Sequence, residues 1–320
     1  MPRLKSVIGW LGATTLFASP ALWAADSTLW LERMAQAVRE QSYHGSYVYE
    51  RSGIFTTQDI WKQVGDDGIQ ERLLQTAGRY QEWLRQDGRL VCATNSSLSQ
   101  GRSQTSLRAG VDPEQLLEWY SMRNLGTTRI ASRDVTVIGI QPKDGFRFAH
   151  ELYIDHETGL VLKSLLVDER RELLERFQFT TISFDEAGYS TGLEPGESCR
   201  EVSVVEPPAG VDVPFWEPQW IPPGFTLGER QIQSINGDGP YVSSQIYSDG
   251  LTSFTLFVEP LGRDKLAEDL RARLGPTVAV SRRLMADSDF YLATVVGEIP
   301  PRAAERIADS LSEAVVGARR

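Results

Sequence analysis

Turn signals in the C-terminal third of the chain constrain its fold more than any other feature. Three runs rich in β-branched and aromatic residues, at 225–235, 241–248 and 251–260, are separated by Asn-Gly-Asp-Gly at 236–239 and Ser-Asp-Gly at 248–250. Asn-Gly and Asp-Gly pairs tolerate the positive φ angles that tight hairpin turns require. The three runs are therefore predicted to form an antiparallel β-meander.

A segment rich in tryptophan and proline leads into this meander. Phe215, Trp216 and Trp220 are interleaved with three prolines. Because proline fixes φ and lacks a backbone donor, we expect an extended entry segment here and not a helix. After the meander, residues 263–274 are predicted to form a short amphipathic helix and residues 300–315 a closing helix.

Strand-like runs also dominate the first half of the chain. They occupy residues 43–93 and 127–184, where Asp-Gly pairs such as that at 87–88 mark hairpin turns. Strands joined by tight turns indicate an antiparallel sheet. Two helices are expected beside them, one that begins at the N-cap Ser27 and one that begins with Pro113.

A chain of 320 residues is long enough for two domains, and the pattern predicts an α+β fold. We expect a large antiparallel β-domain with helices on one face at 26–185 and a smaller antiparallel α+β domain at 213–320. Between them, residues 186–212 are rich in Pro and Gly and are predicted to be a linker.

The first 25 residues have the pattern of a secretory signal. Arg3 and Lys5 precede an apolar run at 7–23, and Ala24 and Ala25 offer a cleavage site. A retained membrane anchor is the alternative, but the run is shorter than the roughly 20 residues that a span requires. There is no lipobox cysteine, so a lipoprotein is not expected.

Charge excludes several classes of partner. The net charge is −10, and no Lys/Arg cluster exceeds a short pair. Such a chain is a poor candidate for nucleic-acid binding, and it lacks the basic patch that would hold it to an anionic bilayer.

Two cysteines follow the signal, Cys92 and Cys199. In an oxidising compartment two thiols can form a disulfide, which would tie the first domain to the segment that leaves it. The alternative is two unpaired thiols, and sequence alone supplies no distance between them.

Motifs for catalysis and metal binding are weak. Residues 188–192 match G-x-S-x-G, but a hydrolase elbow needs a helix after Ser190, and Pro-Gly follows instead. His44, His150 and His156 all precede Ser190, whereas that fold places its histidine last. The spacing of six between His150 and His156 does not match H-E-x-x-H. We therefore expect no enzyme, no metal and no cofactor.

Motifs in the C-terminal third carry a family resemblance. W-x-P-x-W-x-P-x-G-F at 216–225, IYSDGL at 246–251, VGEIPP at 296–301 and AERIAD at 304–309 resemble the C-terminal domain of the MucB/RseB family. Members of this family are periplasmic negative regulators of an envelope-stress sigma factor. The N-terminal half also looks like the larger domain of the family, so the resemblance covers essentially the whole mature chain.

The resemblance implies a fold and a function. The large domain is expected to be an unclosed antiparallel barrel with helices against its hollow, similar to lipoprotein carriers. The expected partner is the periplasmic segment of a transmembrane anti-sigma factor of MucA or RseA type. Binding would shield that segment from proteolysis, and lipid or lipopolysaccharide fragments would release it. A periplasmic location, a homodimer and a hinge at 185–213 are further expectations.

Two sets of large apolar residues are candidate binding residues, and the hydrophobic core is the alternative assignment for both. The set expected to contact the partner is Trp216, Trp220, Phe225, Tyr247, Phe254 and Phe257. The set expected to line a lipid cavity is Trp61, Leu73, Leu74, Trp83, Trp119 and Tyr153. Trp and Tyr are favoured anchors at protein interfaces.

Two other functions remain open. A lipid or lipoprotein carrier would use the same concave fold, although it would not need the domain that begins at residue 213. A secreted hydrolase would require an active-site cluster around Ser190 that the sequence does not contain.

Overall fold

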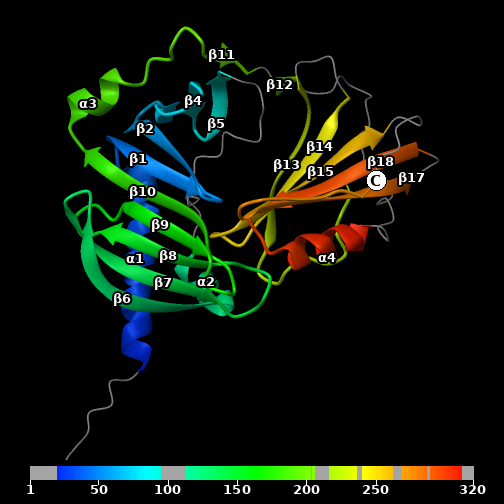
Figure 1. Cartoon of the computed structure of the whole chain (residues 1–320), viewed down its shortest axis with the longest axis horizontal. Helices are drawn as coiled ribbons and strands as arrows, with labels where there is room; N and C mark the ends of the chain where they lie inside the picture. Colours follow the sequence, from blue (N-terminus) through cyan, green and yellow to red (C-terminus); the bar gives the residue numbers. More distant parts are fainter. Residues whose placement is uncertain are drawn as a thin grey trace, which may run out of the picture.

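The computed structural model describes residues 20–94, 112–202, 204–205, 216–235, 240–261, 269–286 and 289–311. Two antiparallel sheets lie side by side, each with its own hydrophobic core (Figure 1). The larger sheet has 11 strands and the smaller one 7. This arrangement confirms the predicted α+β class with a large and a small antiparallel domain.

The large sheet is an unclosed antiparallel array. Its strands are β1 (Tyr43–Arg51), β2 (Ile54–Gly65), β3 (Gly68–Gln75), β4 (Gln81–Gln86), β5 (Arg89–Ala93), β6 (Tyr120–Ile130), β7 (Arg133–Pro142), β8 (Ala149–Asp155), β9 (Val161–Val167), β10 (Leu173–Ser183) and β11 (Arg200–Glu201). They follow the order β11-β5-β4-β3-β2-β1-β10-β9-β8-β7-β6, so β11 and β6 are the two edges. The expected open sheet is confirmed.

Helix α1 (Pro20–Glu40) packs on one face of this sheet. Leu31 and Met34 are buried against Ile138 on β7 and Leu152 on β8. The helix begins seven residues before the predicted cap Ser27, because proline is well tolerated in a first helical turn and nothing in the following apolar residues stops the helix. Helix α2 (Pro113–Trp119) begins as predicted, and its cap Asp112 accepts two backbone N–H bonds.

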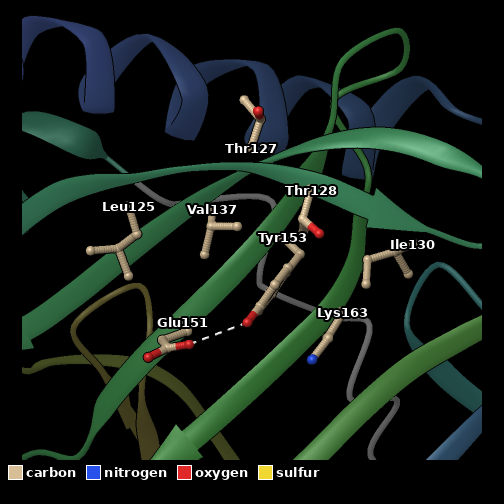
Figure 2. A pocket seen from close by; sticks show the side chains of 8 residues that line it. All are labelled: Leu125, Thr127, Thr128, Ile130, Val137, Glu151, Tyr153 and Lys163. Atoms are coloured by element: carbon tan, nitrogen blue, oxygen red, sulfur yellow. Dashed lines mark hydrogen bonds between the residues drawn. The ribbon is translucent and has the colours of Figure 1, made fainter.

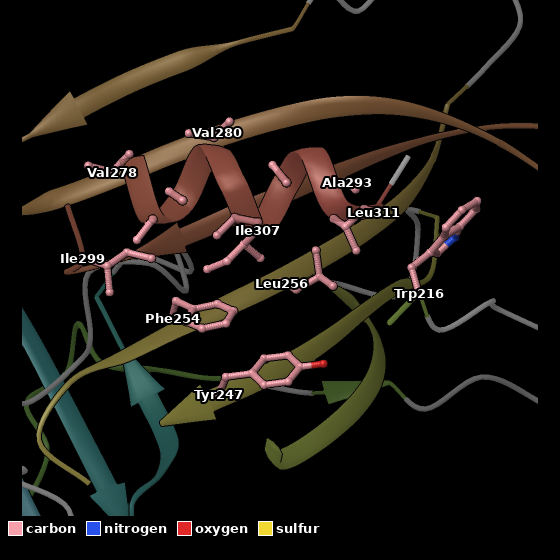
Figure 3. Packing of buried hydrophobic residues seen from close by; sticks show 14 of the residues in the cluster. Trp216, Tyr247, Phe254, Leu256, Val278, Val280, Ala293, Ile299, Ile307 and Leu311 are labelled. Atoms are coloured by element: carbon pink, nitrogen blue, oxygen red, sulfur yellow. The ribbon is translucent and has the colours of Figure 1, made fainter. Parts of the chain in front are cut away.

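The small sheet contains the predicted meander. Its strands are β12 (Val204–Val205), β13 (Thr226–Ile235), β14 (Val242–Ser248), β15 (Ser253–Leu261), β16 (Arg271–Leu274), β17 (Thr277–Ala286) and β18 (Asp289–Gly297), in the order β12-β13-β14-β15-β18-β17-β16. Helix α4 (Pro301–Leu311) covers one face and buries Ala304, Ile307 and Leu311 (Figure 3). The closing helix is therefore confirmed over these residues.

The helix predicted at 263–274 is wrong at its C-terminal end. Residues 271–274 form β16, which pairs with β17 through a tight turn at Gly275, where φ is +61°. A positive φ suits glycine and closes a hairpin, and pairing with β17 overrides the helical pattern. Residues 262–268 lie outside the described residues.

The predicted linker contains structure that belongs to both sheets. Helix α3 (Glu186–Thr191) packs on β1 and β2. Two short strands follow α3, and β11 pairs with β5 of the large sheet while β12 pairs with β13 of the small one. Cys92 and Cys199 form a disulfide beside β11, which ties this segment to the large sheet.

Candidate functional site

A buried ion pair joins the two domains. Arg147 Nε, from the loop before β8, donates to Asp249 Oδ2 in the turn between β14 and β15 at 2.6 Å, and both side chains are 0% exposed. The hydroxyl of Tyr120 on β6 donates to the same oxygen at 2.8 Å. Asp249 Oδ1 accepts from the backbone N–H groups of Leu251 and Thr252, so the turn itself orients the carboxylate.

The guanidinium of Arg147 is held along all its edges. Besides Asp249, it donates to the carboxylate of Asp144 in its own domain and to the carbonyl of Pro223 in the small domain. The rings of Trp119 and Phe225 lie 5.6 and 4.9 Å from its central carbon, in the range of cation–π attraction. Trp119 and Phe225, predicted for different sites, therefore meet here.

Further contacts between the domains surround this pair. Arg51 on β1 reaches Glu298 at 2.8 Å, and Arg302 on α4 pairs with Glu169. The predicted residue Trp220 packs edge-on against Phe146 with ring centroids 5.0 Å apart. We call the contact zone formed by these residues and the Arg147–Asp249 pair the seam.

The small-domain core accounts for most of the predicted partner residues. Trp216, Phe225, Tyr247 and Phe254 are buried in the cluster that α4 covers (Figure 3). This is the core assignment that the sequence left open, so these four side chains form no exposed surface in the described structure. Their part in partner binding stays a prediction.

Phe257 is different, because it points away from α4. It lies opposite Ser244 on β14 and Thr294 on β18, on the sheet face away from the α4 core. We call this surface the distal face. Its half-buried side chains are Ile246, Phe257, Leu292, Thr294 and Val296. In the described structure α4 lies on the other face of this sheet, and apolar side chains that stay partly exposed on one face are typical of interaction sites.

Strand alternation divides the predicted lipid-binding residues between two faces. Leu73 and Trp83 are paired across β3 and β4 and are buried in the core of the large domain. Leu74 and Trp61 lie on the opposite face, because successive strand residues point to opposite sides. These residues therefore do not share one face of the sheet, and their part in lipid binding stays a prediction. Tyr153 packs against the same core as Leu73 and Trp83.

A pocket of about 410 Å³ opens on the large sheet beside Tyr153 (Figure 2). Its lining residues come from β6 to β9 and are Leu125, Thr127, Thr128, Ile130, Val137, Glu151, Tyr153 and Lys163. The hydroxyl of Tyr153 donates to Glu151 at 3.3 Å, and Lys163 Nζ lies 4.5 Å from the Tyr153 ring. Burial, with a contribution from nearby Arg176, lowers the pKa of Lys163.

Sequence reasoning found only Tyr153 among these lining residues. The signal that could have found the others is register, because Val137, Tyr153 and Lys163 lie side by side on three adjacent strands. The arginines and carboxylates of the seam carried no sequence signal, since their partners are 102 or more positions away.

Ser190 does not occupy a hydrolase elbow. It lies inside the six-residue helix α3, and its Oγ donates to the carbonyl of Glu186 at 2.7 Å. His44 Nε2 is 3.1 Å from Asp185 Oδ1, so the neighbouring histidine contacts an aspartate. Among the described residues, no three His, Cys, Asp or Glu side chains gather to hold a metal. No helix in the part of the chain that the structure describes has the length and apolarity of a membrane span.

Comparisons with known proteins place the chain among sigma-factor regulatory proteins. Residues 26–203 match the MucB/RseB N-terminal domain and residues 212–312 match the MucB/RseB C-terminal domain. The chain belongs to the MucB/RseB family. It is 41% identical over 311 residues, 97% of each chain, to the sigma factor AlgU regulatory protein MucB of Pseudomonas aeruginosa. It is 27% identical to the sigma-E factor regulatory protein RseB of Haemophilus influenzae, over 87% of this chain and 88% of that protein.

Solved structures agree with this assignment. In the complex of MucA with MucB from Pseudomonas aeruginosa, the matching chain is 40% identical with a TM-score of 0.73. That match covers 92% of this chain and 100% of the other. A crystal structure of MucB is 38% identical with a TM-score of 0.70, over 89% of this chain and 97% of that one.

Proposed function

We propose that this protein is a periplasmic regulator that binds the periplasmic segment of a transmembrane anti-sigma factor of MucA or RseA type. The observation that carries the proposal is the match, over nearly the whole chain, to a protein solved in complex with MucA. Bound in this way, the regulator shields the segment from regulated proteolysis and keeps the sigma factor sequestered. The relatives are named as regulators, which supports a role without catalysis.

The distal face supports the proposal physically. A peptide that binds a folded surface needs apolar anchor pockets together with backbone or helix-face complementarity. Phe257, Leu292 and Val296 supply half-buried apolar area on a face that α4 leaves uncovered. We propose that the partner segment binds on this distal face.

Release by a lipid signal is the second part of the proposal. The pocket at Tyr153 offers apolar walls at Leu125 and Val137 and one ammonium group at Lys163. An anionic lipid fits this chemistry, with its acyl chain on the walls and its charge near Lys163. If the lipid prefers the partner-free form, it lowers partner affinity, and by linkage the partner lowers lipid affinity equally.

Titration of the purified mature protein with a fluorescent periplasmic segment of the cognate anti-sigma factor tests the proposal. We expect saturable binding that Phe257→Ser weakens about tenfold, because a half-buried aromatic anchor is lost. Phe55→Ser is the matched control, since Phe55 is 59% exposed on β2 of the other domain. Absence of binding by the wild-type protein, or equal weakening by both variants, contradicts the proposal.

A lipid or lipoprotein carrier is the second candidate, and the Tyr153 pocket is the observation that favours it. A carrier binds acyl chains and does not recognise the anti-sigma segment. Binding of a fatty acid without binding of the segment would therefore select the carrier. The same titrations, run with and without lipopolysaccharide, distinguish a lipid-sensing regulator from one that ignores lipid.

A further inference from the structure

We propose that Arg147 and Asp249 are positioning residues that lock the two domains in one arrangement and thereby set affinity for the partner. The inference rests on the proposed function for its second half only. Its first half, the lock, concerns the two domains themselves and can be measured without any partner.

The contacts of the Arg147 guanidinium restrict the relative orientation of the two domains as well as the distance between them. Three nitrogens of the Arg147 guanidinium contact three different segments, the Asp249 turn, Asp144 and the Pro223 carbonyl. Two of these segments belong to the small domain and one to the large domain. A planar fork held on all sides permits little rotation of one domain relative to the other.

Burial makes the pair selective for this one arrangement. A desolvated ion pair gives little net stability, because the cost of dehydrating both charges offsets their attraction. A shift of one domain that parts Arg147 from Asp249 while both stay buried would leave each charge without its partner. An unpaired buried charge is strongly unfavourable. Arrangements in which Arg147 misses Asp249 are therefore suppressed.

Among the residues that the structure describes, Arg147 is the cation that pairs with Asp249. Besides Arg147, the titratable neighbours are Tyr120, which donates to it, and His150 on β8. Burial lowers the pKa of His150 to about 4, so this imidazole is neutral at physiological pH. The buried carboxylate of Asp249 is thus balanced by the guanidinium of Arg147, which the carboxylate of Asp144 also contacts.

The proposed partner surface lies on the small domain, and one strand connects it to the lock. The Asp249 turn connects β14 to β15, and β15 carries Phe257 on the distal face. Rotation of the small domain about the seam would move the distal face relative to the large domain. A segment that contacts both domains would then lose part of its surface.

Asp249→Asn is the sharpest test. The amide oxygen of asparagine still accepts from Leu251 and Thr252, so the turn is kept while the charge that pairs with Arg147 is removed. Tyr120→Phe removes only one hydroxyl donor and is the graded variant. Arg302→Gln is the matched control, because the pair with Glu169 also joins the domains but both side chains are more than half exposed.

The measurement is the distance distribution between spin labels on the two domains, introduced with Gln70→Cys on β3 and Glu229→Cys on β13, with the native disulfide intact. Both positions are exposed. We expect one narrow distribution for the otherwise unaltered protein and for Arg302→Gln, a broader or shifted one for Asp249→Asn, and an intermediate result for Tyr120→Phe. Circular dichroism confirms that each variant is folded before it is measured.

Affinity for the anti-sigma segment is then measured on the same variants. We expect Asp249→Asn to weaken binding about tenfold, within the usual range of coupling between sites, and Arg302→Gln to change it less than about twofold. A distribution that stays narrow in folded Asp249→Asn overturns the lock. A broadened distribution with unchanged affinity overturns its role in binding. If the unaltered protein does not bind the segment, the proposed function fails while the distances still decide the lock.

Discussion

Phe254 and Phe257 lie three positions apart on β15 and point to opposite faces of the small-domain sheet. Phe254 is fully buried and stacks on Tyr247 with ring centroids 4.9 Å apart. Phe257 lies beside Ser244 and Thr294 on the distal face. Strand β15 therefore contributes Phe254 to the core and Phe257 to the candidate partner surface.

This division predicts different effects of truncation on stability. Phe254→Ala is expected to lower the free energy of unfolding by about 3–5 kcal/mol, because it leaves a cavity in a packed core. Phe257→Ala is expected to cost about 1 kcal/mol, since its ring is only half-buried. Urea denaturation of both variants checks the prediction. Equal losses would mean that both rings are core residues.

The meander and the antiparallel strands of the large domain were predictable because their signals are local, whereas the open form of the large sheet was implied by the family resemblance. Asn-Gly and Asp-Gly pairs mark turns within a few residues of the strands that they join. The helix predicted at 263–274 failed at residues 271–274 for the opposite reason, because β16 is decided by pairing with β17 and not by its own periodicity. The assignment of β11 and β12 to different sheets likewise depends on tertiary pairing.

The disulfide predicts a dependence of stability on redox state. Cys92→Ser/Cys199→Ser is expected to lower the free energy of unfolding by about 4 kcal/mol in the chain-entropy model, since the bond closes a loop of 107 positions. The pairing of Arg200 with Ala93, next to the bond, is expected to lose hydrogen-exchange protection first.

Denaturation with and without dithiothreitol measures this effect. Reductant is expected to bring the wild-type protein to the stability of the double variant and to leave the variant unchanged. A wild-type midpoint that does not move after complete reduction would show that the bond adds no stability.

Asp155 predicts a dependence of stability on acid. Burial by itself raises the pKa of this carboxyl, but hydrogen bonds from Arg133 and Thr158 outweigh burial and hold the pKa below its usual range. The charged form therefore stabilises the fold above the unfolded-state pKa of about 3.9, and this contribution is lost as pH falls through the lower folded-state value.

Asp155→Asn is accordingly expected to cost about 2 kcal/mol at pH 7, and its deficit is expected to shrink below about pH 4. Urea midpoints of wild type and variant across pH 2–7 give the comparison. Asp134→Asn is the control, because the Asp134 pair with Arg129 is more than half exposed and is expected to contribute little. A deficit independent of pH would contradict the assignment.

The candidate binding residues were less predictable than the fold. The sequence pattern around an aromatic strand residue is the same whether its side chain faces the core or a ligand. Only the register of the strand against its neighbours shows which face the side chain lies on. Leu73 and Leu74 illustrate this, since adjacent positions cannot line one cavity. Arg147 and Asp249 are in contact only because the two domains pack together, and no local sequence pattern predicts that contact.

Lys163 carries the last prediction, which concerns the lipid signal. Its ammonium is the cation of the Tyr153 pocket and lies over the Tyr153 ring. Lys163→Glu reverses the charge beside the proposed headgroup site and is expected to weaken binding of an anionic lipid about tenfold, while a neutral lipid of the same chain length is unaffected. Arg79→Glu is the control, because it makes the same charge change at an exposed position away from the pocket. Calorimetric titration with anionic and neutral lipids separates the outcomes, and equal weakening by both variants would show that net charge, not the pocket, governs lipid binding.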